Sequence, residues 1–300
     1  MNMSKSKKVV LYSCKLLSLI PAVRIIPKFF YRINRVFSRL KFSYSYYRKN
    51  LSFMAKWIFK DTEDSNFYYK LDDRNKLHLV SVMTYITGLK NQEIQSYLNE
   101  IEEDMNLKHE IENFLKDAHY GKDIVVEFGR RIGWYILVRS QKPRIIVETG
   151  VDHGVGSLVL TSALLRNKDE GFSGFYYGTD INKNSGKLLR GKYAEFGKIL
   201  FGDSIATLSQ FEEKIDLFIN DSDHSADYES KEYEVVAPKL SRNAIILGDN
   251  SHATNALYDF SLKTGRNFLF FKEMPTNHWY PGAGIGISFL ENRERDSFES

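Results

Sequence analysis

Cysteine is almost absent from this 300-residue chain, because Cys14 is the only one. No intrachain disulfide can form, and we expect the protein in a reducing compartment, the cytoplasm, either free or peripheral on a membrane. Long apolar runs are also lacking, since Val9–Ile20 is interrupted by Lys15 and is too short to cross a bilayer. With 43% hydrophobic residues, the chain can still bury one domain of catalytic size plus an extension.

Acidic residues are missing from the first 60 positions, which hold 14 lysines and arginines. The remaining 240 residues carry 28 basic and 38 acidic side chains. The chain therefore combines a basic arm, residues 1–60, with a mildly acidic body. Lysines before Val9 resemble the start of a secretory signal, but no Ala-x-Ala cleavage site follows, so a cleaved signal is disfavoured.

The basic arm predicts an amphipathic helix with Pro27 in its first turn, where proline is tolerated. Apolar and basic residues each recur every three or four positions, which places them on separate faces. The apolar face holds Phe29, Phe30, Ile33, Val36, Phe37 and Leu40, and the basic face holds Lys28, Arg32, Arg35 and Arg39. Such a helix suits an anionic membrane surface, and it equally suits packing against its own domain or a partner. Nucleic acid ranks last, because no known nucleic-acid-binding module accompanies the arm.

Residues 61–120 are predicted to form a helical lead-in with a solvated acidic face, and Asp123–Ser140 a further helix. After these, five apolar runs of strand length alternate with helical or turn segments, which is typical of a parallel sheet covered on both faces. The runs are Ile145–Glu148, Phe175–Thr179, Lys198–Phe201, Leu217–Asn220 and Ala244–Leu247.

Two more predicted strands, Asn267–Glu273 and Gly284–Leu290, leave no room between them for a helix and are expected to pair antiparallel. Residues 121–300 are thus predicted to fold as a doubly wound α/β sheet, mostly parallel, that ends in a hairpin. Ligands of such sheets bind outside the carboxyl ends of the strands. The residues at those ends are therefore the candidates for function.

A glycine-rich turn follows the first predicted strand and precedes a predicted helix at Ser157–Leu165. Gly150, Gly154 and Gly156 there permit unusual dihedral angles and a close approach of a ligand to the backbone. The spacing is not the G-x-G-x-x-G of nicotinamide-binding proteins, and the turn alone is a weak signal.

Acidic residues accompany three successive predicted strands. Asp180 could accept hydrogen bonds from both hydroxyls of a ribose. Asp203 and Ser204 could hydrogen-bond to the edge of an adenine. Glu148, before the glycines, could orient the turn or meet a cationic ligand group. Each aspartate alone could be an ordinary turn former. Acids at all three strand ends favour a nucleoside-containing cofactor.

With these features the sequence resembles the class I S-adenosylmethionine-dependent methyltransferases, and within them the methyltransferase-24-like group, which includes sugar O-methyltransferases. The resemblance covers roughly residues 121–290. The matching pieces are "VETGVDHGVGS" (147–157), "YYGTDIN" (176–182), "FGDSIATL" (201–208), "IDLFINDSDHSADY" (215–228) and "AIILGDN" (244–250).

The resemblance implies that the glycine turn at Gly150 holds the methionine part of S-adenosylmethionine, Asp180 the ribose, and that Asp203 lies near the adenine. One departure is that the usual tight G-x-G-x-G is absent, because Asp152-His153 occupies its centre. The residues expected to bind the cofactor are Glu148, Gly150, Gly154, Asp180, Asp203 and Asp221.

A second constellation follows the fourth and fifth predicted strands, which are neighbours in a doubly wound sheet. Asp221, Asp249 and Asn250 should therefore converge beside the glycine turn. Two carboxylates and an amide form an all-oxygen set that suits Mg²⁺. The set resembles the metal triad of the catechol and caffeoyl-CoA type O-methyltransferases. A metal-free variant of the same site is the alternative.

His224 is the expected general base, three residues past Asp221, at a place where the catechol-type enzymes have a lysine. It could instead ligate or support a metal, and Asp223 could merely cap the following helix. His252 is the second candidate for the base, and His153 could contact a ligand.

The sequence therefore predicts an S-adenosylmethionine-dependent methyltransferase that acts on a hydroxyl of a sugar or glycan precursor, with Mg²⁺ or a similar cation assisting. A lipid-linked acceptor would explain the basic arm. The alternatives are an NAD-dependent oxidoreductase, which the glycine spacing disfavours, and a membrane-recruited binding protein with a vestigial methyltransferase fold, which the intact acids disfavour. The oligomeric state is left open.

Overall fold

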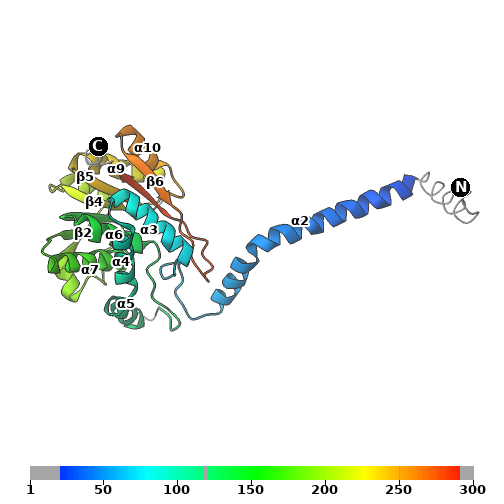
Figure 1. Cartoon of the computed structure of the whole chain (residues 1–300), viewed down its shortest axis with the longest axis horizontal. Coiled ribbons are helices and arrows are strands. Elements are labelled where there is room, and N and C mark those ends of the chain that lie inside the picture. Colours follow the sequence, from blue (N-terminus) through cyan, green and yellow to red (C-terminus); the bar gives the residue numbers. More distant parts are fainter. Residues whose placement is uncertain (1–20, 118–119, 250, 291–300) are drawn as a thin grey trace, which may run out of the picture. The chain divides into compact units, whose positions relative to one another are not determined.

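The computed structural model describes residues 21–117, 120–249 and 251–290, with side chains from residue 29 onward (Figure 1). The chain divides into two compact units, Met1–Ile58 and Phe59–Ser300. None of the described helices is long and apolar enough to cross a membrane.

The first unit contains one long helix, α2 (Pro21–Ile58), of 38 residues. At 1.5 Å per residue this helix is about 57 Å long. It begins earlier than the sequence analysis predicted: Pro27 lies in the helix interior, where its missing N–H costs one backbone hydrogen bond, and Pro21 stands at the start. The prediction of a first-turn Pro27 was wrong because the helical segment continues upstream of it.

The second unit is built on a seven-stranded sheet with the strand order β3-β2-β1-β4-β5-β7-β6. The strands are β1 (Ile145–Thr149), β2 (Phe175–Asp180), β3 (Gly197–Phe201), β4 (Ile215–Asn220), β5 (Leu240–Gly248), β6 (Asn267–Phe271) and β7 (Ile285–Phe289). Strands β1 to β5 run parallel to one another, and β7 runs antiparallel between β5 and β6. The predicted fold class, a mostly parallel doubly wound sheet with a terminal antiparallel hairpin, is confirmed.

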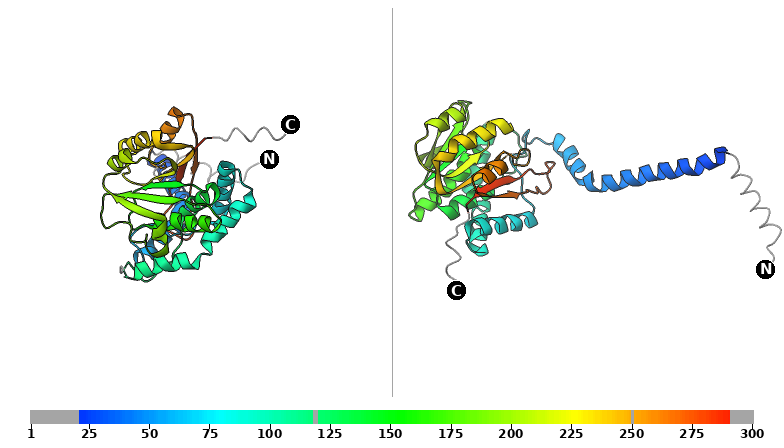
Figure 2. Two further views of the ribbon diagram at one scale, coloured as in Figure 1. Left: turned by 90° about the vertical axis from the view of Figure 1, so that its left-hand side faces the viewer. Right: turned by 90° about the horizontal axis from the view of Figure 1, so that it is seen from above.

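Helices cover both faces of the sheet (Figure 2). On one face lie α3 (Asp73–Thr87), α4 (Asn91–Glu102), α5 (Met105–Asp117), α6 (Arg131–Gln141) and α7 (Val155–Asp169), and on the other α8 (Ser204–Gln210), α9 (Ala226–Val236) and α10 (Ala256–Lys263). Adjacent residues of β4 point to opposite faces of the sheet. Ile219 packs in the core between the sheet and α6 and α7, whereas Phe218 packs in the core between the sheet and α9 and α10. Strands buried on both faces explain the continuous apolar runs in the sequence.

The helical lead-in shares its core with the sheet. Leu79, Ile94 and Ile111, from α3, α4 and α5, are fully buried in the same cluster as Ile146 of β1. Hydrophobic burial on this scale ties these helices to the sheet. Residues 61–120 thus belong to the same compact unit as the residues after them.

The predicted helix at Asp123–Ser140 was wrong in its first half, because α6 begins only at Arg131. Gly129 has φ +51°, and its N–H donates to the carbonyl of Tyr69 at 3.1 Å. A side chain at Gly129 would overlap the Tyr69 ring. The segment before α6 is therefore held by this tertiary contact in a shape that a helix does not allow.

Candidate active site

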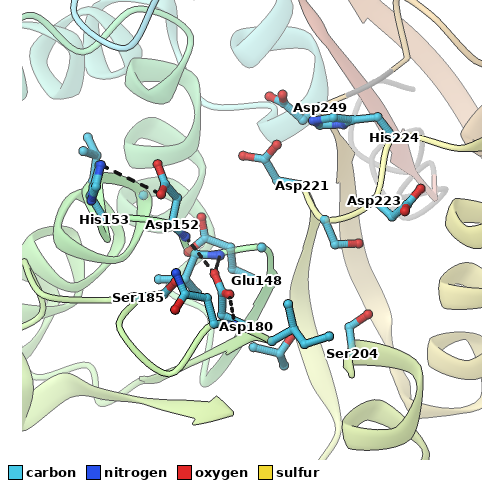
Figure 3. A pocket seen from close by; sticks show the side chains of 18 of the residues that line it. Glu148, Asp152, His153, Asp180, Ser185, Ser204, Asp221, Asp223, His224 and Asp249 are labelled. Atoms are coloured by element: carbon cyan, nitrogen blue, oxygen red, sulfur yellow. Dashed lines mark hydrogen bonds and ion pairs between the residues drawn. The ribbon is translucent and has the colours of Figure 1, made fainter. Parts of the chain in front are cut away.

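A cavity of roughly 660 Å³ lies at the carboxyl ends of the central strands (Figure 3). Its size is usual for small-molecule sites. It brings together six residues that were predicted to bind a cofactor or a metal: Glu148, Gly150, Asp180, Asp203, Asp221 and Asp249. Gly154 is not a lining residue, whereas Gly156 of the same turn is.

The glycine turn crosses the tip of β4 closely. Gly150 has φ +79°, and a side chain there would overlap the carbonyl oxygen of Asp221. Gly154, with φ +92°, caps α7 without any side-chain hydrogen bond. The positive dihedral angles and the close approach explain why glycine stands at both positions.

Asp180 holds the glycine turn in place. Its Oδ2 accepts the backbone N–H groups of Val151 at 3.1 Å and Asp152 at 2.9 Å, and its Oδ1 accepts that of Asn182 at 2.7 Å. These three bonds occupy much of the hydrogen-bond-accepting capacity of the Asp180 carboxylate, which was predicted to accept ribose hydroxyls. Contact between Asp180 and a ribose stays a prediction.

Asp203 caps α8 at the cavity wall. Its Oδ1 accepts the N–H of Ala206 at 2.8 Å, and its Oδ2 accepts the hydroxyl of Tyr228 at 2.7 Å. The backbone N–H of Ala206, followed by the Tyr228 hydroxyl, lowers the pKa of Asp203. Asp203 is therefore an ionised cap, the local role that the sequence analysis held as its alternative, and it also lines the cavity.

Glu148 is a buried acid at the end of β1, with only 2% of its surface exposed. The hydroxyl of Tyr176 donates to it, and a side chain at Gly156 would overlap its Oε1. Burial raises the pKa of Glu148 to about 7. Glu148 thus packs against the first turn of α7 and can change charge near neutral pH.

The tips of β4 and β5 lie side by side, as predicted. The N–H of Asp249 donates to the carbonyl of Asn220 at 3.0 Å, and the side chains of Asp221 and Asp249 lie close to one another (Figure 3). Burial first, and then the Asp249 carboxylate, raises the pKa of Asp221 well above its usual value. The two carboxyl groups form a pair at the neighbouring strand tips.

An arginine that the sequence analysis did not single out pairs with Asp249. Nη2 of Arg130 donates to Oδ2 of Asp249 at 2.7 Å, and Nε donates to Oδ1. Nη1 donates to the hydroxyl of Tyr69 at 3.1 Å and lies 3.6 Å from Oε1 of Glu273, which is fully buried. One guanidinium therefore bridges the cavity wall and the segment after β6.

One residue of the predicted metal set, Asp249, is paired with an arginine in this arrangement. Both carboxylate oxygens of Asp249 already accept from Arg130, whose positive charge lies where a cation would bind. Across residues 21–117, 120–249 and 251–290, no group of three His, Cys, Asp or Glu side chains is arranged to hold a metal ion. Asn250 lies outside the described residues, so its role and that of Asp221 as ligands stay predictions.

The two candidate bases differ in position. His224 is exposed and lines the cavity near the β4 tip (Figure 3). His252 is not a lining residue, and its Nδ1 lies 3.3 Å from the carbonyl oxygen of Asp249. Asp223 accepts the N–H of Ser225 at 2.7 Å and so shapes the turn before α9. Of the two histidines, only His224 is placed to take a proton from a molecule in the cavity.

A third histidine meets the cavity beside the glycine turn. Nε2 of His153 lies 2.7 Å from the hydroxyl of Tyr120, and its ring packs against those of Phe67 and Phe114. This aromatic cluster covers one side of the turn.

Two residues that sequence reasoning missed, Arg130 and Arg131, open α6. They stand directly before the apolar stretch "IGWYILV", and two adjacent charges at the head of a buried helix were a usable signal. Tyr69 and Glu273 gave no such signal. They meet only through tertiary structure, since 204 positions separate them in the chain.

Residues 147–251 match the family model described as a methyltransferase domain. The matched segment contains the glycine turn and the tips of β1 to β5. No curated protein matches the chain.

Similar solved structures include a methyltransferase from Geobacter sulfurreducens, with 16% identity, coverage of 68% of this chain and 99% of that chain, and a TM-score of 0.47. The O-methyltransferase TomG from Streptomyces achromogenes, in complex with SAM, has 15% identity, coverage of 63% and 90%, and a TM-score of 0.46. An O-methyltransferase from Bacillus cereus in complex with SAH has 13% identity, coverage of 66% and 100%, and a TM-score of 0.45.

Proposed function

We propose that this protein is an S-adenosylmethionine-dependent methyltransferase that acts on a hydroxyl group. One observation carries the proposal: the glycine turn and the acids at the carboxyl ends of β1, β2 and β3 line a single cavity. The same segment matches a methyltransferase domain. Backbone approach at Gly150 together with carboxylates at successive strand tips suits a nucleoside-containing donor.

The donor, when bound, supplies a methyl group activated by a sulfonium. A hydroxyl oxygen forms the new bond to the methyl carbon, the carbon–sulfur electron pair returns to sulfur, and the hydroxyl proton must leave. His224 takes that proton, because it is exposed in the cavity and an imidazole is suited to proton transfer near neutral pH. The cavity walls hold the two reactants in line, which is the other main source of rate.

The acceptor that we propose is a sugar or glycan hydroxyl. The cavity beyond the glycine turn is polar, and Asp221, Ser222 and Asp223 line it along the β4 tip. Oxygen acceptors of this kind suit a ligand that carries several hydroxyl donors. The resemblance to the group that includes sugar O-methyltransferases supports the same class.

The proposal requires no metal ion. The bidentate pairing of Arg130 with Asp249 takes up the carboxylate on which a divalent site would depend. The cation prediction is therefore tested separately, by chelation.

Calorimetric titration tests the function against its alternative. The protein should bind S-adenosylhomocysteine and S-adenosylmethionine and leave NADH unbound. Tight NADH binding without S-adenosylmethionine binding would establish the oxidoreductase instead. Methyl transfer from labelled S-adenosylmethionine to extracted glycans, with His224→Gln as the variant and His252→Gln as the control, then tests the base. A loss of about 100-fold or more is expected for His224→Gln only.

We also propose that α2 rests on an anionic membrane surface. Its apolar side chains are open to solvent, with Phe29 58%, Phe37 64% and Leu40 62% exposed. Residues 1–60 contain no acid, so the helix is cationic along its whole length. An exposed apolar face beside a basic one is the pattern of helices that lie in the headgroup layer. A lipid-linked glycan would then be presented at the same surface.

Vesicle co-sedimentation of the full chain tests this surface. Replacing Arg32, Arg35 and Arg39 together by Gln should weaken binding to phosphatidylserine vesicles on the order of 100-fold, since each basic residue contributes about 1 kcal/mol. The matched control replaces three exposed lysines of the second unit, Lys183, Lys187 and Lys192, by Gln. Equal pelleting of the full chain and the arginine variant would remove the membrane proposal.

A further inference from the structure

Arg131, the first residue of α6, is a buried cation with almost no hydrogen bonding. Only 5% of its surface is exposed. Its Nη1 donates to the carbonyl of Phe67 at a long 3.4 Å, and its buried Nε has no hydrogen-bond partner in the part of the chain that the structure describes. The guanidinium stacks over the rings of Phe67 and Trp134, at 5.5 and 5.7 Å from their centres. Aromatic faces stabilise a cation, but they leave its N–H groups unpaired.

Arg130, the residue before Arg131, has the same side chain but is well paired. Arg130 pairs with both oxygens of Asp249 and reaches Tyr69 and Glu273 as well. No such ion pair exists for Arg131 among the described residues. The positive charge of Arg131 acts to lower the pKa of Glu148 and of Asp221, but neither carboxyl group forms an ion pair with it. Burying a guanidinium without hydrogen-bonded partners is costly, so its place in the cavity wall indicates a ligand anion.

The position of Arg131 adds a second, independent anion-binding feature. Arg131 lines the same cavity as Gly150, Val155 and Gly156. Gly156 lies in the first turn of α7, a helix of 15 residues whose cap, Gly154, makes no side-chain hydrogen bond. The backbone N–H groups of that turn and the helix dipole favour negative charge. The Trp134 ring, over which Arg131 stacks, touches Gly156 closely enough that a side chain there would collide with it.

Glu148 supplies the opposite charge beside this anion site. It lines the cavity and packs against Gly156. A cation and a carboxylate at one end of a cavity fit a zwitterionic α-amino acid group, whose carboxylate would meet Arg131 and whose ammonium would meet Glu148. Among molecules with a nucleoside part, such a group is the amino acid end of the donor proposed above.

We propose that Arg131 binds the α-carboxylate of the methionine end of the donor, together with the first turn of α7, and that Glu148 binds its ammonium group. The proposal rests on the proposed function. It assigns donor specificity to a residue on α6, outside the segment 147–251 that matches the family model. The cavity therefore selects for the amino acid end of the donor as well as for its nucleoside.

The test compares two ligands that differ only at that end. S-Adenosylhomocysteine carries the amino acid group, and 5′-methylthioadenosine carries the same nucleoside and thioether without it. Arg131→Met keeps the unbranched stem and removes the charge. We expect calorimetry to show S-adenosylhomocysteine binding weakened about 10- to 100-fold in this variant. Binding of 5′-methylthioadenosine should change less than about twofold.

Two controls accompany the variant. Arg131→Lys keeps a positive charge and should retain part of the S-adenosylhomocysteine affinity. Arg144→Met removes an exposed arginine just before β1, at the amino ends of the strands, and should change the binding of neither ligand. Equal weakening of both ligands by Arg131→Met, or no weakening of either, would overturn the inference. If the unmodified protein binds neither ligand, the proposed function fails first, which the same titrations reveal.

Discussion

The carboxyl groups on the two sides of the cavity have different partners. On the turn side, formed by Gly150, Asp180 and Asp203, the acids accept backbone N–H groups. Asp203 accepts that of Ala206 in α8, and Asp180 accepts those of Asn182 and of Asp152 in the glycine turn. On the paired-acid side, formed by Asp221, Asp249 and Arg130, the two carboxyl groups face one another. They also face the guanidinium of Arg130, the residue just before α6.

The difference shows that the surroundings of an acid at a strand tip determine its pKa and therefore its charge. The backbone N–H of Ala206 and the Tyr228 hydroxyl lower the pKa of Asp203, so this carboxylate on the turn side keeps its charge. Burial, and then the neighbouring Asp249, raise the pKa of Asp221, so this carboxyl group on the paired-acid side favours a proton. The first arrangement suits the binding of neutral hydroxyl and amine donors, and the second depends on Arg130 for its charge balance.

The largest effect is expected from Arg130→Met on the paired-acid side. Removing this guanidinium leaves Asp249 and Glu273 buried without their cation, so the free energy of unfolding should fall by about 3–5 kcal/mol. Urea unfolding followed by circular dichroism measures it. Arg144→Met, the exposed control, should cost less than about 0.5 kcal/mol. A loss below about 1 kcal/mol for Arg130→Met would show that the two sides do not differ in this way.

The next effect concerns Glu148, which lies between the two sides. Burial holds its pKa near about 7, above the usual 4.5, so protonation favours the folded state. Its contribution to stability is fully present below about pH 4.5 and is lost as the pH rises through about 7. Relative to Glu148→Gln, the protein should lose about 3 kcal/mol of unfolding free energy between those limits. Parallel stability curves for the two proteins would refute the shifted pKa.

A smaller effect is expected from Gly150→Ala on the turn side. The new methyl group would meet the carbonyl of Asp221 at a positive φ, so stability should fall on the order of 2 kcal/mol and S-adenosylhomocysteine binding should be lost. Gly171→Ala is the matched control, since Gly171 has φ +89° but open space around it. That variant should cost about 1 kcal/mol and leave binding intact. If the two variants behave alike, the close approach to β4 has no role.

The smallest effect is expected from chelation. If Arg130 takes the place of a cation on the paired-acid side, EDTA or added Mg²⁺ should leave the melting temperature and S-adenosylhomocysteine affinity unchanged. Differential scanning calorimetry with and without chelator checks this. A rise of several degrees with Mg²⁺ that Asp249→Asn abolishes would restore the predicted metal site.

Local sequence was enough to predict the sheet and the helix cap at Asp203, because the apolar runs and this cap depend on short stretches of chain. The hydrogen bonds of Asp180 to Val151 and Asp152 span 29 and 28 positions, and its predicted contact with a ribose stays a prediction. The adjacency of Asp221 and Asp249 also followed, because it depends only on strand order.

The partners of those acids could not be predicted in the same way. Arg130 reaches Asp249 across 119 positions, and Tyr69 reaches Glu273 across 204, so no periodicity links them. Gly129 illustrates the same limit, since the spacing of Ile124 and Phe128 is helical while the contact of Gly129 with Tyr69 prevents a helix there. Tertiary contacts overrode the local pattern in both cases.

The position of β7 has a consequence for biosynthesis. Residues 285–289 come after every other strand in the chain, yet they fill the gap between β5 and β6. Until residues 285–289 have left the ribosome, β6 has no strand to pair with, and one edge of β5 is unpaired. Completion of the sheet must therefore wait until residues 285–289 have been made, and a product truncated before residue 285 would expose β6 and one edge of β5 to aggregation or to a chaperone.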